Sequence, residues 1–154
     1  QAVTRYEALK HAVKAHAGQV DKCGRPYILH PIAVAEAVET FDTLHTGNYE
    51  VVALLHDVWE DTDYNDHNGW LTRSQQSALE RLTRPKREGY FDYIDRLKDD
   101  PLSAVVKLAD LWHNLQPERQ ACLPEGERKS LEKRYLKARD RIWEALGYRW
   151  WPEQ

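Results

Sequence analysis

Residues 49–61 read Tyr-Glu-Val-Val-Ala-Leu-Leu-His-Asp-Val-Trp-Glu-Asp. Apolar residues recur in this stretch at spacings of three and four, which predicts an amphipathic helix from Tyr49 to Trp59. At about 100° per residue, four polar side chains fall within one arc of the helical wheel: His56, Asp57, Glu60 and Asp61. Valines, leucines and a tryptophan fill the opposite arc. The stretch therefore predicts a helix that is fixed in a core and presents one imidazole beside three carboxylates.

The charge on this helix face is one-sided. A solvated face usually mixes Lys or Arg with Glu, and a solvated face is the alternative interpretation for Glu60 or Asp61 taken alone. Here Glu50 and the three other acidic residues lie at near-neighbour positions with no cation among them. Like charges at such spacing cost roughly several tenths of a kcal/mol per pair, unless a bound cation reverses the sign. The set as a whole therefore favours a metal site.

A second predicted helix, Leu102 to Leu115, carries a carboxylate in a more apolar setting. Lys107, Asp110 and Asn114 form one narrow stripe along it. An unpaired carboxylate beside buried surface is costly. Asp110 is therefore expected either to pair with Lys107 or another helix, or to bind a metal.

His30 is a third candidate, because it precedes Pro31 at the expected start of another helix. A single histidine at such a position is often a cap or a structural residue. Together with His56, Asp57 and Asp110, however, it offers two imidazoles and two carboxylates. This set of nitrogen and oxygen ligands suits Mn²⁺, Fe²⁺ or Zn²⁺.

The helical period recurs along the chain, and no stretch has a convincing strand pattern. The sequence therefore predicts an all-α bundle of about seven helices, in a single domain over residues 1–154. The five other expected helices are Val3 to Ala17, Ile32 to Val38, Ser74 to Leu82, Gly89 to Leu97 and Gly126 to Leu146. Polar loops are expected from Gly18 to Leu29 and from Thr62 to Leu71. The expected boundary signals are Pro31 at a first helical position, a capping box of Thr72 with Gln75, and Gly18 and Gly147 directly after helix ends.

The composition excludes several classes of function. With 22 Lys and Arg against 25 Asp and Glu, the net charge of −3 gives no basic stripe of the kind that binds long nucleic acids. No apolar run reaches the length of about 18 residues that a membrane span needs, and the start lacks the apolar core of a signal peptide. The chain contains no Met, so we expect its start to be trimmed. Cys23 and Cys122 form no CxxC pair, and we expect two reduced thiols in a cytoplasmic protein.

Four motifs follow one another between about Ala8 and Leu146: Ala15-His-Ala-Gly-Gln19, Gly24-Arg-Pro-Tyr-Ile-Leu-His-Pro31, Ala53-Leu-Leu-His-Asp-Val-Trp-Glu-Asp-Thr62, and Val106-Lys-Leu-Ala-Asp110 with Asn114. In this order they resemble the HD hydrolase domain of the RelA/SpoT alarmone enzymes, especially the stand-alone small alarmone hydrolases, metazoan SpoT homologues among them. The resemblance implies an all-helical HD fold and removal of pyrophosphate from the 3′ position of ppGpp or pppGpp, which leaves GDP or GTP. It also implies one divalent ion, usually Mn²⁺, bound by His30, His56, Asp57 and Asp110.

On the same pattern, Glu60 and Asp61 match the pair that handles the attacking water and proton transfer. The chemistry is coherent, because a metal activates water while an adjacent carboxylate orients or deprotonates it. The implied substrate contacts are Lys22, Arg25, Tyr27, Lys86, Lys107, Asn114 and Tyr135. Packing or surface roles remain alternatives for Tyr27, Lys86 and Tyr135. Leu111 stands where relatives usually carry a basic residue, so guanine preference is less firmly implied than hydrolysis.

Two other functions remain open from the sequence. The same chemistry could act on an adenosine alarmone, a nucleoside monophosphate or the phosphate of NADPH. The chain could also bind metal and nucleotide without turnover, although a mere binder would not require the Glu60 and Asp61 pair. Either way, the expected partner is a small nucleotide, with neither long nucleic acid nor membrane. The paired Trp in Tyr148 to Pro152 either folds back on the core or forms a homo-oligomer contact.

Overall fold

The computed structural model describes residues 4–62 and 69–152. These residues form nine helices and no strand beyond one isolated bridge between Val20 and Pro26, which confirms the predicted all-α class. In chain order the helices are α1 (Arg5–Ala15), α2 (Leu29–Glu39), α3 (Asn48–Leu55), α4 (Val58–Asp61), α5 (Arg73–Leu82), α6 (Tyr90–Leu97), α7 (Pro101–Asn114), α8 (Pro117–Gln120) and α9 (Glu125–Leu146). Val3 and residues 63–68 of the predicted helix and loop lie outside the described residues.

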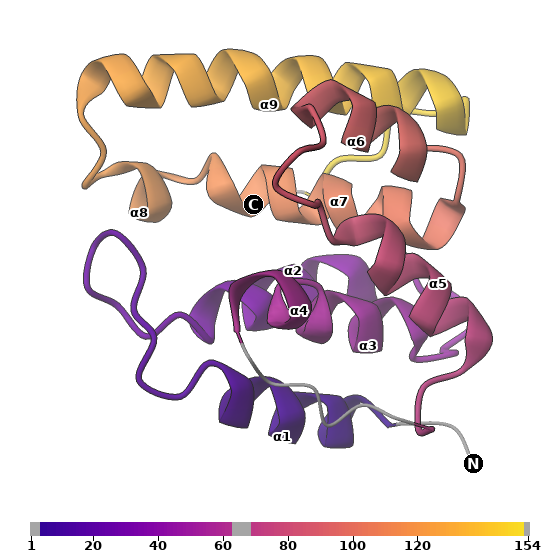
Figure 1. Ribbon diagram of the computed structural model, residues 1–154. Coiled ribbons are helices and arrows are strands. Elements are labelled where there is room, and N and C mark those ends of the chain that lie inside the picture. The colour runs from indigo at the N-terminus through magenta and orange to yellow at the C-terminus, as the bar shows by residue number, and fades with distance from the viewer. Residues whose placement is uncertain (1–3, 63–68, 153–154) are drawn as a thin grey trace.

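The helix α7 is the centre of the bundle. In Figure 1, α1 to α4 form the lower half, α6 to α9 form the upper half, and α5 links the two at one edge. Helix α7 packs against α2 and α3 below and against α9 above. Nine of its side chains are buried, because apolar residues surround most of its circumference. A polar side chain in the middle of α7 is therefore held inside the protein.

Several predicted helix boundaries need correction. The capping box of Thr72 and Gln75 is present, and Gly147 follows α9 in the left-handed conformation, as expected. Gly18 is also left-handed, with φ 77°, but it lies two residues beyond the C-cap His16 rather than directly after α1. Pro31 is the third residue of α2, which begins at Leu29. Proline is tolerated there because the N–H groups of the first turn have no partner inside the helix.

The predicted helix from Tyr49 to Trp59 is two helices. Helix α3 ends at Leu55, α4 begins at Val58, and the backbone at Asp57 has φ −102° and ψ −4°. The interruption separates Glu50 from the other acidic residues. The Glu50 side chain is buried and lies near Asp42 instead. Glu50 therefore does not belong to the acidic strip that the wheel suggested.

The two cysteines are joined, which overturns the expectation of reduced thiols. A disulfide connects Cys23 and Cys122, whose Cα atoms lie 5.4 Å apart although 99 positions separate them in sequence. It ties the loop between α1 and α2 to the connection between α8 and α9. Helix α8 itself was not predicted, because four residues are too few to display a period.

The C-terminal tail folds back onto the bundle. The Trp143 indole N–H donates to the Trp150 carbonyl at 2.7 Å, and the Trp143 and Trp151 rings meet edge to face. These contacts agree with the first of the two interpretations of the tail. Among the helices described, none is both long and apolar enough to cross a membrane.

Candidate metal centre

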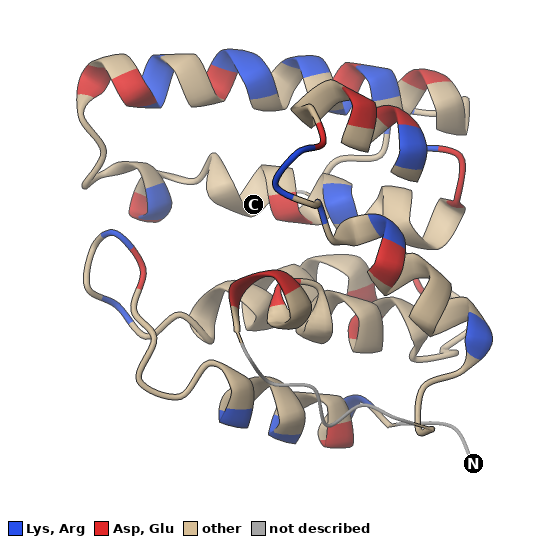
Figure 2. Ribbon diagram, in the orientation of Figure 1, with Lys and Arg blue, Asp and Glu red and all other residues tan. Residues whose placement is uncertain are grey.

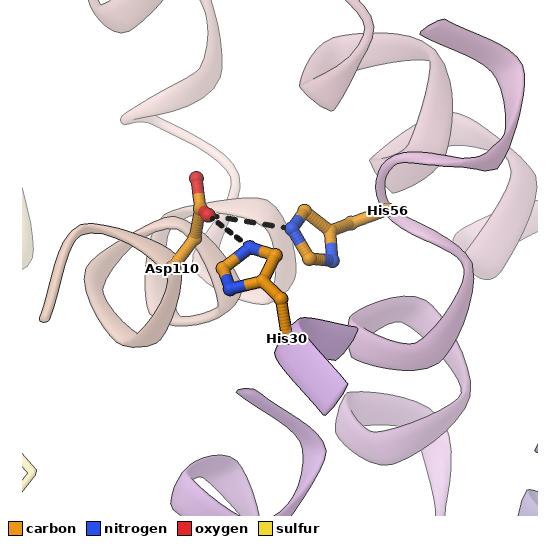
Figure 3. A group of neighbouring side chains, drawn as sticks. All are labelled: His30, His56 and Asp110. Atoms are coloured by element: carbon orange, nitrogen blue, oxygen red, sulfur yellow. Dashed lines mark hydrogen bonds and ion pairs between the residues drawn. The ribbon is translucent and has the colours of Figure 1, made fainter. Parts of the chain in front are cut away.

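Two histidines and an aspartate converge at the meeting point of three helices. His30 comes from the first turn of α2, His56 from the end of α3, and Asp110 from the middle of α7. Figure 3 shows both rings pointing at the carboxylate. The Asp110 Oδ1 atom lies 2.9 Å from His30 Nε2 and 3.4 Å from His56 Nε2. All three residues are buried, and one ligand atom from each lies within 4.8 Å of the other two.

Asp57 adds a fourth candidate ligand atom, the second oxygen, at the interruption between α3 and α4. Its Oδ2 atom lies 3.1 Å from His56 Nε2 and 3.5 Å from His30 Nε2. The structure therefore brings together the four side chains that the sequence predicted as metal ligands: His30, His56, Asp57 and Asp110. Their facing atoms are two imidazole nitrogens and two carboxylate oxygens.

The orientation of the His56 ring tests whether this set fits a cation. The Nδ1 atom lies 2.5 Å from the Ala53 carbonyl oxygen, so Nδ1 carries the hydrogen and donates. In the neutral ring, Nε2 then has a lone pair that faces the oxygens of Asp57 and Asp110. That buried nitrogen has no hydrogen-bond partner of acceptable geometry. Three acceptors facing one another require a cation between them, and the donor set suits a divalent metal.

The two histidines differ in protonation without a metal. Burial lowers the pKa of His30 to about 4, despite its contact with Asp110. Burial acts in the same direction on His56, but the Asp57 and Asp110 carboxylates outweigh it and hold the His56 pKa well above its usual value. His30 is therefore neutral at pH 7, whereas His56 carries the proton that balances the carboxylates.

Asp110 is shared between Lys107 and the imidazoles. Lys107 Nζ lies 2.8 Å from Asp110 Oδ2, while Oδ1 faces the histidines and accepts from the Asn114 amide at 3.0 Å. Although burial raises the pKa of Asp110, Lys107 and both histidines lower it well below its usual value. The two roles considered for Asp110 are thus compatible, because each oxygen serves one of them.

Glu60 and Asp61 stand in α4 at the rim of the centre. The Tyr27 hydroxyl lies 2.7 Å from Asp57 Oδ2 and 3.0 Å from Asp61 Oδ2, so it bridges the centre and the rim. Partial burial and repulsion from Asp57 raise the pKa values of both Glu60 and Asp61. Figure 2 shows α4 as an acidic segment. Both carboxylates are thereby made better proton acceptors than free ones.

A cavity of about 280 Å³ opens over the centre. Of the predicted substrate contacts, it is lined by Tyr27, Lys107, Asn114 and Tyr135. Three further cations that the sequence did not single out also line it: Arg84, Arg119 and Arg134. They come from three separate segments, and no local pattern marks them. With Lys107 they give the cavity four positive side chains beside its carboxylates.

A second cavity of about 250 Å³ adjoins the first. The two share the lining residues Tyr27, Asn114, Arg119 and Tyr135. Apolar side chains contribute to the walls of the second, among them Val20, Leu123 and Leu131. One cavity is therefore rich in charge and the other is partly apolar.

The remaining predicted contacts take different places. Lys22 lines the second cavity and pairs with Glu127. Arg25 lines neither cavity and lies 3.6 Å from Glu118 instead. Lys86 is exposed and also lies outside both, and Arg84 takes the place expected for it. The prediction of Arg25 and Lys86 as contacts is thus not supported by their positions, because each side chain belongs to a different surface.

Known proteins show the same combination of sequence and fold. No protein-family model matches the chain. A probable GTP pyrophosphokinase of Mycobacterium leprae is 33% identical over 74% of this chain and 16% of its own. The guanosine-3′,5′-bis(diphosphate) 3′-pyrophosphohydrolase of Haemophilus influenzae is 33% identical over 66% of this chain and 17% of its own. The chain therefore spans about one sixth of the length of these relatives.

A solved structure, titled as a metazoan orthologue of SpoT that hydrolyses ppGpp, superposes with a TM-score of 0.72. It is 25% identical, and the match covers 92% of this chain and 86% of the other. The helical bundle and its converging histidines and aspartates define a domain of the HD-like class. Within that class, the chain belongs to the RelA/SpoT family.

Proposed function

We propose that this chain is a metal-dependent phosphohydrolase that removes pyrophosphate from the 3′ position of ppGpp-type alarmones. One observation carries the proposal: two imidazole nitrogens and two carboxylate oxygens converge at the floor of a cavity lined by four cations. The activities named for the relatives support it, since they include hydrolysis of this bond. Release of GDP from ppGpp, or GTP from pppGpp, is part of the proposal.

The four converging side chains would hold one divalent ion, with Mn²⁺ expected and Fe²⁺ or Zn²⁺ as alternatives. When bound there, such an ion supplies Lewis-acid activation of water and of a phosphoryl oxygen. Lys107 keeps Asp110 oriented through its second oxygen, whereas the Tyr27 hydroxyl donates to Asp57 Oδ2, the same oxygen that faces the histidines. The ligand geometry is therefore supported from outside the set of four.

Glu60 and Asp61 are proposed to move the proton. The water oxygen bonds to the phosphorus attached to O3′, the bond between that phosphorus and O3′ breaks, and the pyrophosphate released carries the water oxygen. One carboxylate takes a proton from the water, and the O3′ leaving group gains one. The raised pKa values of both carboxylates suit this exchange, because a general base works best when its pKa lies near the pH of the reaction.

The two cavities divide the substrate by its chemistry. Arg84, Lys107, Arg119 and Arg134 line the space above the centre, which suits the anionic 3′ pyrophosphate. Guanidinium groups suit phosphate oxygens because their N–H groups can donate in pairs. The adjoining, partly apolar cavity suits the nucleoside, with Tyr27 and Tyr135 lying at the junction.

The proposal is tested by offering ppGpp, ppApp and NADPH to the Mn²⁺-loaded protein and resolving the products by chromatography. We expect GDP and pyrophosphate from ppGpp. The double variant Glu60→Gln, Asp61→Asn should lose about 100-fold or more in kcat while retaining Mn²⁺. Orthophosphate released from a monoester would instead indicate a different HD phosphohydrolase. Tight nucleotide binding without any product would indicate a binding module.

A further inference from the structure

Behind the metal centre, the second nitrogen of His30 is also engaged. His30 Nδ1 lies 2.8 Å from His113 Nδ1, and His113 Nε2 lies 2.9 Å from Glu118 Oε1. His113 is 5% exposed, and its ring stacks on that of His30 with centroids 5.1 Å apart. His113 follows Asp110 on α7 and Glu118 belongs to α8. A buried line of two imidazoles therefore leads from the centre to a carboxylate at the surface.

With a cation between His30 Nε2 and Asp110, the hydrogens along this line have one self-consistent arrangement. An ionised carboxylate only accepts, so His113 Nε2 carries the hydrogen that Glu118 receives. The neutral His113 ring then has its lone pair on Nδ1, which accepts from His30 Nδ1. His30 is left with its lone pair on Nε2, the atom that faces Asp57 and Asp110. Glu118 thus determines, through His113, which nitrogen of His30 can bind a metal.

We propose that His113 and Glu118 are positioning residues that hold His30 in its metal-binding tautomer and orientation, and so set the affinity of the centre for its ion. This rests on the metal site of the proposed function. Outer partners of this kind commonly change metal affinity by about 10- to 100-fold. We call the contacts from Glu118 through His113 to His30 the relay. Arg25 lies beside its outer end, where it pairs with Glu118 rather than lining either cavity.

The first test is Mn²⁺ affinity, measured by calorimetry on the wild type, His113→Phe and Glu118→Ala. We expect His113→Phe to weaken binding by about 10-fold or more and Glu118→Ala to weaken it less, because water can replace an exposed acceptor. The matched control is Glu36→Ala, since Glu36 is an exposed carboxylate lining the same hollow as His113 and Glu118. It should leave the affinity within twofold. Far-UV circular dichroism checks folding, and Glu118→Ala alone decides the matter if His113→Phe does not fold.

The second test reads the hydrogen bond directly in the metal-free protein. Nitrogen-15 NMR should show scalar coupling between His30 Nδ1 and His113 Nδ1 across their shared hydrogen. The coupling should vanish in His113→Phe and persist in Glu36→Ala. Its absence from the wild type would overturn the relay.

The outcomes separate this inference from the function on which it rests. Equal Mn²⁺ affinity in the folded variants and the wild type would overturn the positioning role and leave hydrolysis untouched. Mn²⁺ binding without turnover would overturn the proposed function, while the ranking of affinities would still support the relay. A wild type that binds no Mn²⁺ would refute both.

Discussion

The His56 ring meets two carboxylates through the nitrogen that carries its lone pair. Its other nitrogen, Nδ1, donates to the Ala53 carbonyl. A change of tautomer that placed the hydrogen on Nε2 would break this hydrogen bond. Without a metal, a proton on Nε2 supplies the positive charge at that position. The carboxylates of Asp57 and Asp110 stabilise that proton despite burial, which is why the His56 pKa is raised. Proton and metal are therefore alternative occupants of one site.

This competition predicts that metal binding displaces a proton. In the metal-free protein, pH 7 lies below the raised pKa of His56, so the ring is protonated. To bind a metal, the ring must lose that proton and offer the Nε2 lone pair. We expect about one proton released per Mn²⁺ bound, measured by calorimetry in buffers of different ionisation enthalpy. Repeating the titration above the His56 pKa provides the control, because the release should disappear there. A binding heat that is independent of the buffer at pH 7 would contradict this assignment of charge.

A second residue-scale prediction concerns the Tyr27 hydroxyl. Burial and Asp57 raise the pKa of Asp61, and the hydrogen bond from Tyr27 partly offsets that rise. Tyr27→Phe removes the offset, so Asp61 should ionise only at higher pH. If Asp61 must be ionised for proton transfer, the acidic limb of the kcat profile shifts to higher pH. We expect a shift of about a few tenths of a pH unit or more, which corresponds in free energy to the loss of a weak hydrogen bond.

The measurement is kcat between pH 5 and 9 at saturating ppGpp and Mn²⁺. Tyr135→Phe is the matched control, since Tyr135 also lines the cavity but no hydrogen bond links it to Asp61. It should leave the limb in place. A limb that moves to lower pH in Tyr27→Phe would show that Asp61 is not the group being titrated.

At the scale of elements, the interruption between α3 and α4 shows what sequence periodicity can and cannot predict. The period correctly placed His56 and Asp57 beside an apolar face, because burial of that face determines the register. It could not show that the helix stops at Leu55, since no proline or glycine marks the position. Helix α3 packs against α2 and α7, and such tertiary contacts can override the local helical pattern. The convergence of the four candidate ligands was predictable from the sequence, but the backbone that carries His56 and Asp57 was not.

Two carboxyl groups at the beginning of α3, those of Asp42 and Glu50, make the stability of the fold depend on pH. Asp42 accepts from the backbone N–H groups of Thr46 and Gly47 at 3.1 and 2.8 Å and so fixes the turn that enters the helix. Glu50 is 5% exposed and lies beside Asp42, and its Oε2 atom has no partner. Burial and the Asp42 charge raise the Glu50 pKa. The neutral form of Glu50 is therefore the one the fold prefers.

This preference fixes the direction of a stability change. A carboxyl whose pKa is raised by folding contributes most below its unfolded pKa, and that contribution is lost as pH rises through the folded value. The side chain of Glu50→Gln stays neutral at every pH. As the pH rises from 5 to 8, we therefore expect the free energy of unfolding of the variant to increase by on the order of 1 kcal/mol relative to that of the wild type. Urea unfolding at both pH values measures the gain. The exposed Glu132→Gln on α9 is the control, and an equal effect of both substitutions would refute the role of burial.

At the scale of the whole molecule, the centre exists only when the two halves of the bundle close. His30, His56 and Asp57 belong to the lower half in Figure 1, whereas Asp110 comes from α7 in the upper half. The cations Arg84, Arg119 and Arg134 come from three further segments. Motif spacing predicted the four candidate ligands because each lies in a short conspicuous pattern. The cations lie in no such pattern, and the fold brings them to the cavity from the segment after α5, from α8 and from α9.

The disulfide is the other long-range feature that local patterns could not reveal. Pairing of two cysteines depends on their distance in the fold, and 99 intervening positions leave that distance undetermined. Disulfides persist mainly in oxidising compartments, so the bond weighs against the cytoplasmic location expected from the sequence. That location stays a prediction, which cell fractionation with thiol labelling can decide.

The last prediction follows from the segments that the disulfide joins. In the chain-entropy model, closing a loop of this length stabilises the fold by about 4.7 kcal/mol, so Cys122→Ser should lower the free energy of unfolding by up to that amount. Cys23 lines the partly apolar cavity, whereas the four metal ligands stand in or beside packed helices. Loss of the bond should therefore raise KM for the nucleotide and leave Mn²⁺ affinity within about twofold. Urea unfolding with and without a reductant makes the comparison, and the variant, which has no bond to break, is its own control. A wild type whose stability is unchanged by reduction would show that the bond between Cys23 and Cys122 does not hold these segments together.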